Sequence, residues 1–206
     1  YTLILANDVD LGEYLWKPIN GYKRLSGIVV NGNGHTIRNM KVRGCTNSSL
    51  YGAGFIGDIN GAVTVKDIAF DGADVFFVNY AKPQFAGNVG GVVLGYTYGT
   101  TLFENVSVTN SSIWGFGKIG ILLGMGADPG VKVTFKDCVS KNNTIHAAYD
   151  MGGLAGMIQR GNGVDNASVE NCTVENITVD YYEECVDVQG KATLKENDKN
   201  GAYVIK

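Results

Sequence analysis

The chain has 206 residues with a net charge of −3, 29 glycines and only 3 prolines, and 18% of its residues are charged. The acidic balance and the lack of a Lys/Arg cluster argue against a nucleic-acid partner, and the lack of an apolar run of about 18 residues argues against membrane insertion. An apolar fraction of 45% suits one globular domain with a sizeable core. Apolar residues do not recur with a 3.6-residue period, so helices are not predicted.

The first segment, residues 1–34, predicts an N-terminal cap. It offers one strand, an irregular loop and a hairpin-like Asn-Gly-Asn-Gly stretch at positions 31–34. Its residues Asn7, Asp8 and Asp10 have oxygen side chains that could bind calcium, but they lack the fuller spacing of a calcium loop. A polar turn at a strand end is the favoured interpretation.

From residue 35 to residue 182 the sequence repeats. Gly-bounded apolar segments end at Gly57, Gly95, Gly124 and Gly156, and each is followed by a second common segment. The second segment is aligned on an apolar anchor residue: Ile68, Val106, Cys138 and Cys172. Asp or Asn stands just before the anchor (Asp67, Asn105, Asp137, Asn171). Apolar residues stand three before it (Val65, Phe103, Phe135, Val169) and seven after it (Val75, Ile113, Ile145, Val179). An earlier copy supplies Ile37, Asn39, Met40 and Val42 in the same register.

A period of about 30 residues with short alternating segments predicts one stacked unit per copy. Helical repeats need a 3.6-residue spacing and propeller blades need about 40–45 residues, so a parallel β-helix is the better interpretation. The apolar columns are then inward, the Asp/Asn column lies at a bend, and the glycines permit positive φ and close approach of neighbouring coils. The residues two before the anchor point outward and alternate in charge from Lys66 onward (Arg38, Lys66, Glu104, Lys136, Glu170).

The predicted fold is therefore all-β: a single domain, residues 1–206, forming a parallel β-helix of about five coils with irregular caps. The coils occupy residues 35–182. Residues 183–206 lack a Gly-x-x-Gly copy and carry dense charge, so they predict a C-terminal cap or the start of a further segment.

Several ordered motifs resemble the GLUG-type repeat proteins of bacterial surfaces. They are NDVDL (7–11), Trp16-x-Pro18-Ile19, GNGHTIRNMKV (32–42) and GGLAG (152–156). The resemblance covers about residues 1–180 and implies a right-handed parallel β-helix from a secreted or surface-anchored, adhesin-like protein of Bacteroidetes-type bacteria, with no catalytic motif to transfer. The sequence departs from that pattern at Leu25-Ser26-Gly27-Ile28, where an aromatic-led segment is usual, and after residue 180.

An aromatic cluster follows the last apolar column and forms the candidate ligand-binding site. Its members are Phe76, Phe77, Trp114, Phe116, Tyr149, Tyr181 and Tyr182. If these side chains lie along one side of the solenoid, they form a stripe able to contact sugars. The alternative is that they belong to the core.

Catalytic and metal-binding patterns are weaker. A glycosidase needs two carboxylates in a groove, whereas Asp67 and Asp137 share a column but are separated by Asn105. His35 and His146 lack partners at a motif spacing and are interpreted as structural.

The four cysteines form no CxxC, and the sequence has two histidines, so no zinc site is expected. Cys138 and Cys172 share a column and are expected to be buried thiols. A bond between Cys45 and Cys185 is not expected, because they lie at opposite ends of the repeat.

The function predicted from the sequence is a non-enzymatic, secreted or cell-surface binding scaffold. Its expected partner is a host or dietary glycan or a surface protein, and the chain is expected to be a monomer without cofactor or metal. The alternatives are a carbohydrate-active β-helix enzyme, either a polysaccharide lyase or a glycosidase, and a structural spacer within a larger surface protein.

Overall fold

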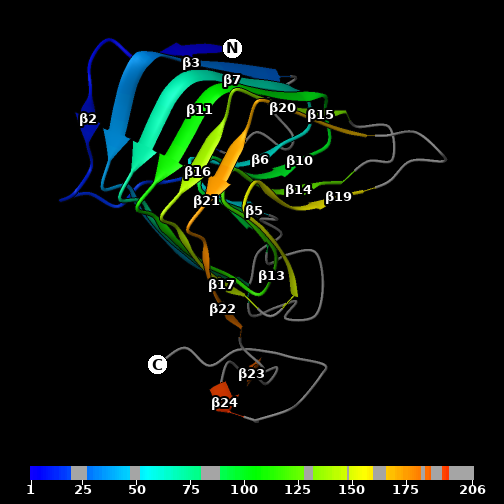
Figure 1. Cartoon of the computed structure of the whole chain (residues 1–206). Coiled ribbons are helices and arrows are strands. Elements are labelled where there is room, and N and C mark those ends of the chain that lie inside the picture. The colour runs from blue at the N-terminus through cyan, green and yellow to red at the C-terminus, as the bar shows by residue number, and fades with distance from the viewer. Residues whose placement is uncertain are drawn as a thin grey trace.

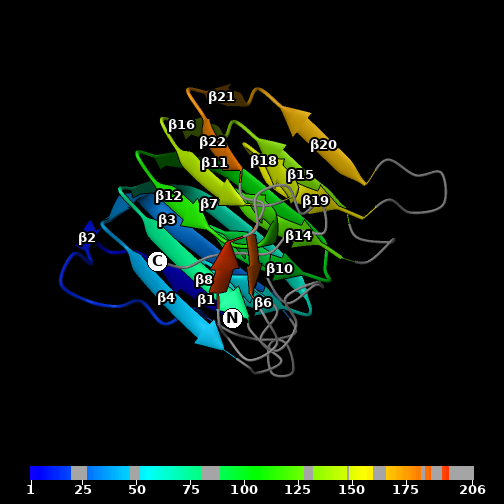
Figure 2. The same cartoon turned by 90° about the horizontal axis from the view of Figure 1, so that it is seen from below.

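The computed structural model describes residues 1–19, 27–46, 52–79, 89–127, 132–147, 149–159, 166–181, 184–186 and 192–194. Within these residues the chain is all-β, contains no helix, and stacks parallel strands as a β-helix-like solenoid does (Figure 1). Figure 2 shows the successive strands of each sheet lying side by side along the axis.

The described residues contribute to four parallel sheets, and one passage of the chain through sheets A, B, D and C is called a coil below. Sheet A contains β1 (Thr2–Ile4), β2 (Val9–Asp10), β3 (Gly27–Arg38), β7 (Ala62–Asp71), β11 (Thr101–Thr109), β15 (Val133–Lys136), β16 (Val139–Lys141), β20 (Ala167–Glu170) and β21 (Thr173–Glu175). Sheet B contains β4 (Lys41–Thr46), β8 (Asp74–Asn79), β12 (Ser112–Trp114), β17 (Thr144–Ala147) and β22 (Thr178–Tyr181). Sheet D contains β5 (Gly52–Ala53), β9 (Val89–Gly91), β13 (Gly117–Gly120) and β18 (Tyr149–Gly152), and sheet C contains β6 (Ile56–Ile59), β10 (Leu94–Thr97), β14 (Leu123–Gly126) and β19 (Ala155–Ile158).

The predicted apolar columns are confirmed as inward ladders on the coils before the last, whereas Val169 and Val179 on the last described coil are 60% and 50% exposed. Val65, Phe103 and Phe135 are register partners on adjacent strands of sheet A, and each is at most 1% exposed. The rings of Phe103 and Phe135 stack with centroids 5.1 Å apart and planes 3° apart. Because equivalent residues of successive coils lie on neighbouring strands, a repeated apolar position becomes a continuous core.

The predicted bend column is also confirmed. Asp67, Asn105, Asp137 and Asn171 have φ between 50° and 53°, in the left-handed region that Asn and Asp tolerate better than other non-glycine residues. A second left-handed column stands five residues after the first and consists of Gly72, Asn110, Asn142 and Asn176. Its asparagines donate side-chain hydrogen bonds from one coil to the preceding one, from Asn176 to Asn142 (3.1 Å) and from Asn142 to Asn110 (3.4 Å).

The register predicted for the first copy is wrong by five residues. Ile37 pairs with Phe70 rather than with Val65, and Asn39, with φ of 55°, occupies the second left-handed column rather than the first. The two bends accept the same residue types, so the sequence pattern alone did not distinguish them. Arg38 therefore pairs with Asp71 and lies outside the alternating charge column.

The other members of that charge column are in register as predicted. Lys66, Glu104, Lys136 and Glu170 occupy equivalent positions on β7, β11, β15 and β20. The Lys136 ammonium lies 2.8 Å from the Glu104 carboxylate. This exposed pair contributes at most about 1 kcal/mol, so its main effect is on strand register.

The Asn-Gly-Asn-Gly stretch does not form a hairpin. It lies inside the continuous strand β3, which pairs in parallel with β7 and carries an irregularity between Asn31 and His35. The positive φ values of Asn33 (53°) and Gly34 (81°) are used there to bend the strand instead of reversing it. The expected boundary between cap and coils at residue 34 thus falls within a strand.

The N-terminal segment follows the course of a coil more closely than an irregular cap would. β1 and β2 pair with β3, Leu15 forms a parallel bridge with Lys41, and Ile19 forms one with Ile56. Trp16 stacks on Phe55 at 4.9 Å, and its indole N–H donates to the Phe55 carbonyl oxygen (2.9 Å). This segment covers the first apolar layer.

Sheets D and C form an arch whose tip enters the core. The tip residues are almost fully buried among the inward side chains: Phe55, Val92, Val93, Ile121 and Leu122. The two arms of the arch approach so closely that a Cβ placed on Gly95 would lie 2.5 Å from the amide nitrogen of Ala53. The close approach predicted at the recurring glycines is therefore confirmed. The positive φ predicted with it is found at Gly54 (154°) but not at Gly95 or Gly124.

Near the C-terminus, β23 (Glu184–Val186) and β24 (Ala192–Leu194) instead form an antiparallel pair.

Candidate functional site

The outer face of sheet B carries one row of register-paired side chains. Arg43 of β4, Phe76 of β8, Trp114 of β12, His146 of β17 and Asp180 of β22 occupy equivalent positions on adjacent strands. The preceding residue on each of the first four strands is buried (Val42, Val75, Ile113, Ile145). Because side chains alternate along a strand, the row points outward. It is called the sheet B row below.

The rings of the sheet B row contact one another along the solenoid axis. Trp114 stacks on His146 with centroids 3.9 Å apart and planes 20° apart. Phe76 lies 6.2 Å from Trp114 with its plane tilted by 43°. One face of the indole is thus covered by the imidazole, while Phe76 and Trp114 both remain partly exposed. The row is a ridge of tilted rings and ring edges rather than a series of flat platforms.

Charged groups flank the rings. The Arg43 guanidinium donates to the Asp74 carboxylate and to the Asp74 carbonyl oxygen (2.9 Å). At the other end His146 Nδ1 lies 3.1 Å from the Asp180 carboxylate. Burial lowers the pKa of His146, and the nearby carboxylates of Asp180 and Asp74 only partly oppose this shift. His146 is therefore a mainly neutral ring at pH 7.

The structure divides the predicted aromatic residues into three groups. Phe76 and Trp114 lie in the row. Phe77 and Phe116 are only 5% and 3% exposed, which corrects their assignment to an exposed stripe. Phe77 directly follows Phe76 on β8 and so faces the opposite side of the sheet, and Phe116 precedes β13 and is buried there.

The remaining predicted tyrosines are Tyr149, Tyr181 and Tyr182. Tyr149 begins β18 and Tyr181 ends β22, but their side chains lie outside the part of the structure that is described. Tyr182 lies wholly outside the described residues. In contrast, His146, which the sequence predicts to be a structural residue, lies in the row opposite Trp114. His146 follows the apolar column by one residue, as Phe76 and Trp114 do, and this spacing is the sequence signal that identifies His146 as a member of the row.

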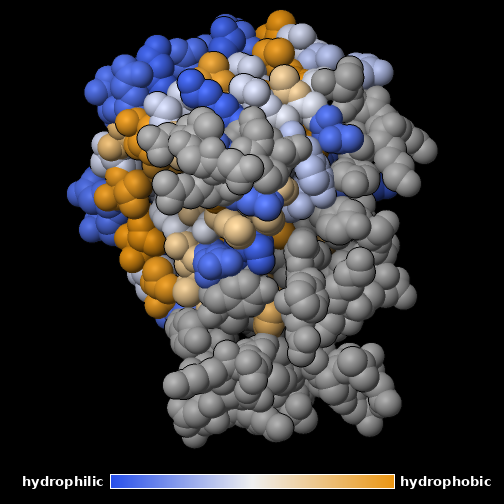
Figure 3. Space-filling model, turned by 90° about the vertical axis from the view of Figure 1, so that its right-hand side faces the viewer, coloured by the Kyte–Doolittle hydropathy of each residue, from blue (hydrophilic) through white to orange (hydrophobic). Residues whose placement is uncertain are grey.

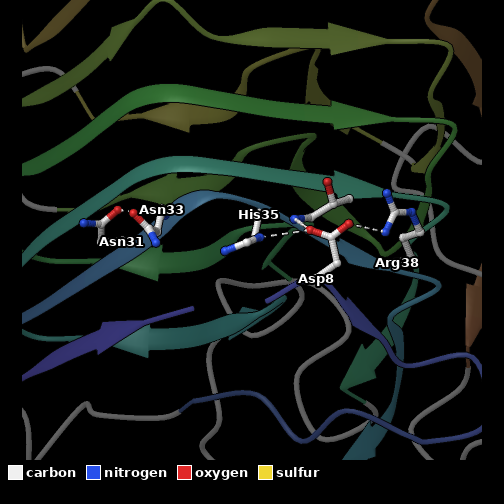
Figure 4. A network of polar contacts seen from close by, with 6 residues as sticks. Asp8, Asn31, Asn33, His35 and Arg38 are labelled. Atoms are coloured by element: carbon white, nitrogen blue, oxygen red, sulfur yellow. Dashed lines mark hydrogen bonds and ion pairs between the residues drawn. The ribbon is translucent and has the colours of Figure 1, made fainter. Parts of the chain in front are cut away.

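A second polar cluster joins the N-terminal segment to β3 (Figure 4). One oxygen of Asp8 accepts from the Thr36 amide (3.1 Å) and lies 3.2 Å from His35 Nδ1, and the other accepts from Arg38 (2.8 Å). These donors, with Arg38 the largest contributor, lower the pKa of Asp8 to about 2. Asp10 is used similarly and accepts from Asn39 (3.0 Å) and from the Gly12 amide (2.9 Å).

The N-terminal carboxylates thus serve as acceptors for protein N–H groups, which supports the polar-turn interpretation over a calcium loop. Of the two carboxylates considered for catalysis, Asp67 is used in the same way, and so is the neighbouring Asp71 on β7. Asp67 accepts from Asn105 (3.0 Å), and Asp71 accepts from Thr109 (2.9 Å) and Asn110 (2.7 Å). These bonds tie one coil to the next.

One buried carboxylate is not anticipated by any sequence signal. Asp58 is 2% exposed in sheet C, and among the described residues its Oδ1 has no hydrogen-bond partner. Burial raises the pKa of Asp58. Its register partner is Tyr96, in a small apolar cluster with Val89 and Met125.

Cys138 and Cys172 are free thiols, and the burial predicted for both is confirmed for Cys138 but wrong for Cys172. Cys138 is fully buried, whereas Cys172 on the last coil is partly exposed. Burial raises the pKa of Cys138 to about 12, which suppresses its thiolate form. Cys45 and Cys185 have no described side-chain environment.

Within the described ranges, no group of three or more His, Cys, Asp or Glu side chains is placed to hold a metal ion. In the same part of the chain, no helix has the length and apolar character needed to cross a membrane. Comparison of the chain with family models, with curated proteins and with solved structures finds no match in any of the three. The fold places the described part of the chain in the class of all-β, parallel, β-helix-like solenoids. The resemblance to GLUG-type repeats remains a prediction from sequence motifs.

Proposed function

We propose that this chain is a non-enzymatic, adhesin-like binding scaffold of a secreted or cell-surface protein. We further propose that it is a right-handed parallel β-helix of about five coils and that it binds carbohydrate on the outer face of sheet B. The observation that carries the proposal is the sheet B row, in which Phe76, Trp114 and His146 stand next to one another on three adjacent strands.

The chemistry of the row suits a carbohydrate. Aromatic rings offer apolar area to the C–H groups of a sugar, and carboxylate and guanidinium groups hydrogen-bond its hydroxyls. Here the rings are flanked by the Arg43–Asp74 pair at one end and by Asp180 at the other. Since the row runs along the solenoid axis, it favours an extended ligand that contacts several coils.

The GLUG resemblance supports the same class of function and the extracellular location. It supplies no residue for a catalytic role. The carboxylates Asp67 and Asp71 already accept hydrogen bonds from the adjacent coil, so they do not favour the enzyme alternative.

The test is a glycan-binding screen of the purified chain, comparing wild type with Trp114→Ala. Tyr14→Ala is the matched control, because Tyr14 is an aromatic residue that is 66% exposed and lies in the N-terminal segment. We expect saturable binding that falls at least about tenfold in Trp114→Ala and is unchanged in Tyr14→Ala. Equal binding by all three proteins would place the ligand elsewhere and contradict the proposal.

A spacer role is the second candidate, favoured by the Trp114–His146 stack. In that stack one face of the Trp114 indole contacts His146 instead of a ligand, as it would in a contact that fixes the register of adjacent strands. For a spacer, no glycan binds and Trp114→Ala lowers the melting temperature. For a binding site, affinity is lost while folding, followed by circular dichroism, is retained.

A further inference from the structure

A second outward column runs beside the sheet B row. Asp74 of β8, Ser112 of β12, Thr144 of β17 and Thr178 of β22 are register partners, and each stands two residues before a member of the row. Residues two apart on a strand face the same side and lie about 7 Å apart. Ser112 and Thr144 are partly exposed and Thr178 is exposed. These three residues are called the hydroxyl column below, and they lie beside the column of rings.

The two columns offer complementary contacts to a sugar chain. Each hydroxyl can donate one hydrogen bond and accept others, as the hydroxyl of a sugar does. The rings offer apolar area to the C–H groups of the sugar. Because both columns run from strand to strand along the axis, an extended chain can contact both at once.

The cations of this face are already used by protein groups. The Arg43 guanidinium donates to the Asp74 carboxylate, and the Lys41 ammonium donates to the Gly12 carbonyl oxygen (2.8 Å). Arg43 and Lys41 are the arginine and lysine described on the outer face of sheet B. A carboxylate or sulfate on a ligand therefore finds no uncommitted cation among the described side chains of this face.

The opposite end of the same face is acidic. The Asp180 side chain is 52% exposed, and the neighbouring His146 is mainly neutral at pH 7 because burial lowers its pKa. A like charge on a ligand costs affinity at such a position, whereas an uncharged sugar hydroxyl can donate to the carboxylate. The face thus disfavours acidic ligands.

The exposed apolar surface at the end of the solenoid has a different chemistry. Val169, Val174 and Val179 of the last described coil are 60%, 49% and 50% exposed. Figure 3 shows orange, hydrophobic surface along the left-hand edge, the side that faces the viewer in Figure 1 and carries this coil. Aliphatic side chains lack the ring face that stacks on a sugar, so this surface provides a control for non-specific apolar binding.

We propose that the outer face of sheet B selects uncharged, extended polysaccharides over acidic ones. Phe76 and Trp114 contact the C–H groups of the chain, while Ser112 and Thr144 bond its hydroxyls. This inference rests on the proposed function, whose glycan site it uses, and adds the chemical class of the ligand.

The test compares polysaccharides that share a backbone and differ in charge. Hydroxyethyl cellulose is paired with carboxymethyl cellulose, and methyl-esterified pectin with polygalacturonate, in affinity electrophoresis of the purified chain. We expect the uncharged member of at least one pair to bind at least about tenfold more tightly than its acidic partner at low salt. The ratio should shrink at high salt, because salt screens the charges.

Matched variants test the hydroxyl column. Thr144→Val removes one hydroxyl and keeps the shape of the side chain, and Thr134→Val makes the same change at a partly exposed position on β15 of sheet A. We expect binding of the uncharged polymer to fall at least about threefold in Thr144→Val. It should be unchanged in Thr134→Val and in Val169→Thr, which alters the apolar surface of the last coil.

The outcomes separate this inference from the proposed function. If none of the polymers binds, or if Trp114→Ala leaves binding unchanged, the proposed function fails and this inference fails with it. If binding depends on Trp114 but the acidic members bind as tightly as the uncharged ones or more tightly, the glycan site stands and this inference is overturned. Equal losses in Thr144→Val and in either control variant would also overturn it.

Discussion

The close packing of the arch makes Gly95 the most informative position for a stability test. A Cβ at Gly95 would lie 2.5 Å from the Ala53 nitrogen and 2.6 Å from the Gly57 oxygen, and all its nearest neighbours are backbone atoms. Gly90 provides the control, since a Cβ there would meet only the tips of Ile113 and Ile119 at 3.2 and 3.4 Å. Both positions lie in sheets of the same arch.

The expected cost of Gly95→Ala follows from these contacts. Relieving them requires the two arms of the arch to separate by nearly an ångström, because backbone cannot rotate away as a side-chain tip can. Overpacking costs about 1–3 kcal/mol, and Gly95→Ala lies at the upper end, about 3 kcal/mol, because every close contact is with backbone; the gain from a stiffer unfolded chain offsets about 0.4–1 kcal/mol of this cost. We therefore expect a net loss of about 2–3 kcal/mol for Gly95→Ala and less than about 1 kcal/mol for Gly90→Ala.

Thermal unfolding followed by far-UV circular dichroism measures this difference. For a chain of this size, 1 kcal/mol corresponds to about 2–4 °C, so Gly95→Ala should melt about 5–10 °C below wild type. The reasoning is refuted if Gly95→Ala melts within about 2 °C of wild type, or if Gly90→Ala is equally destabilised.

Three further predictions concern titratable groups. Because the pKa of Asp8 is lowered to about 2, the Asp8 carboxylate stabilises the fold above pH 3.8, its usual pKa, and this stabilisation is lost as the pH falls toward 2. An NMR titration should show a higher Asp8 pKa in Arg38→Ala than in wild type. An unchanged pKa would contradict the contact between Asp8 and Arg38. Because burial raises the pKa of Asp58, folding favours its protonated form, and stability falls as pH rises from the usual value of 3.8 to that raised pKa. Asp58→Asn should therefore stabilise the fold at pH 7 by about 1 kcal/mol, seen as a higher melting temperature, and the gain should shrink at acidic pH. Because Cys138 is buried and has a pKa of about 12, it should react with a maleimide far more slowly than Cys172 at pH 8, as followed by mass spectrometry over time. Equal rates for the two cysteines would contradict this prediction by showing that the core opens freely.

The sequence predicts sheet A well because two signals coincide there. The apolar positions Val65, Phe103 and Phe135 recur with the left-handed residues Asp67 and Asn105 in a fixed relation, so register follows without knowledge of the loops. The prediction fails at the first copy, where Asn39 fits either of two bends five residues apart. Only the pairing of Ile37 with Phe70 distinguishes the two registers.

The candidate site is predicted less completely. Phe76 and Trp114 could be found because they follow the apolar column by one residue. Phe77 could have been excluded by strand alternation, which places consecutive residues on opposite faces. The burial of Phe116 and Asp58 could not be foreseen, because it depends on how sheets D and C fold back into the core.

The two left-handed columns have a consequence for how this architecture changes in length. The interval from Asp67 to Gly72 is five residues, and so is the interval from Asn171 to Asn176, whereas the whole coil varies from 32 to 38 residues. From β7 onward, insertions and deletions are therefore absorbed in the connections between sheets, while the corner keeps a fixed length. The exception is β3, which has two extra residues between Asn31 and His35 relative to β7. A foreign peptide placed in such a connection would leave the ladder pairing intact, which makes the solenoid a suitable framework for displaying grafted sequences at regular axial intervals.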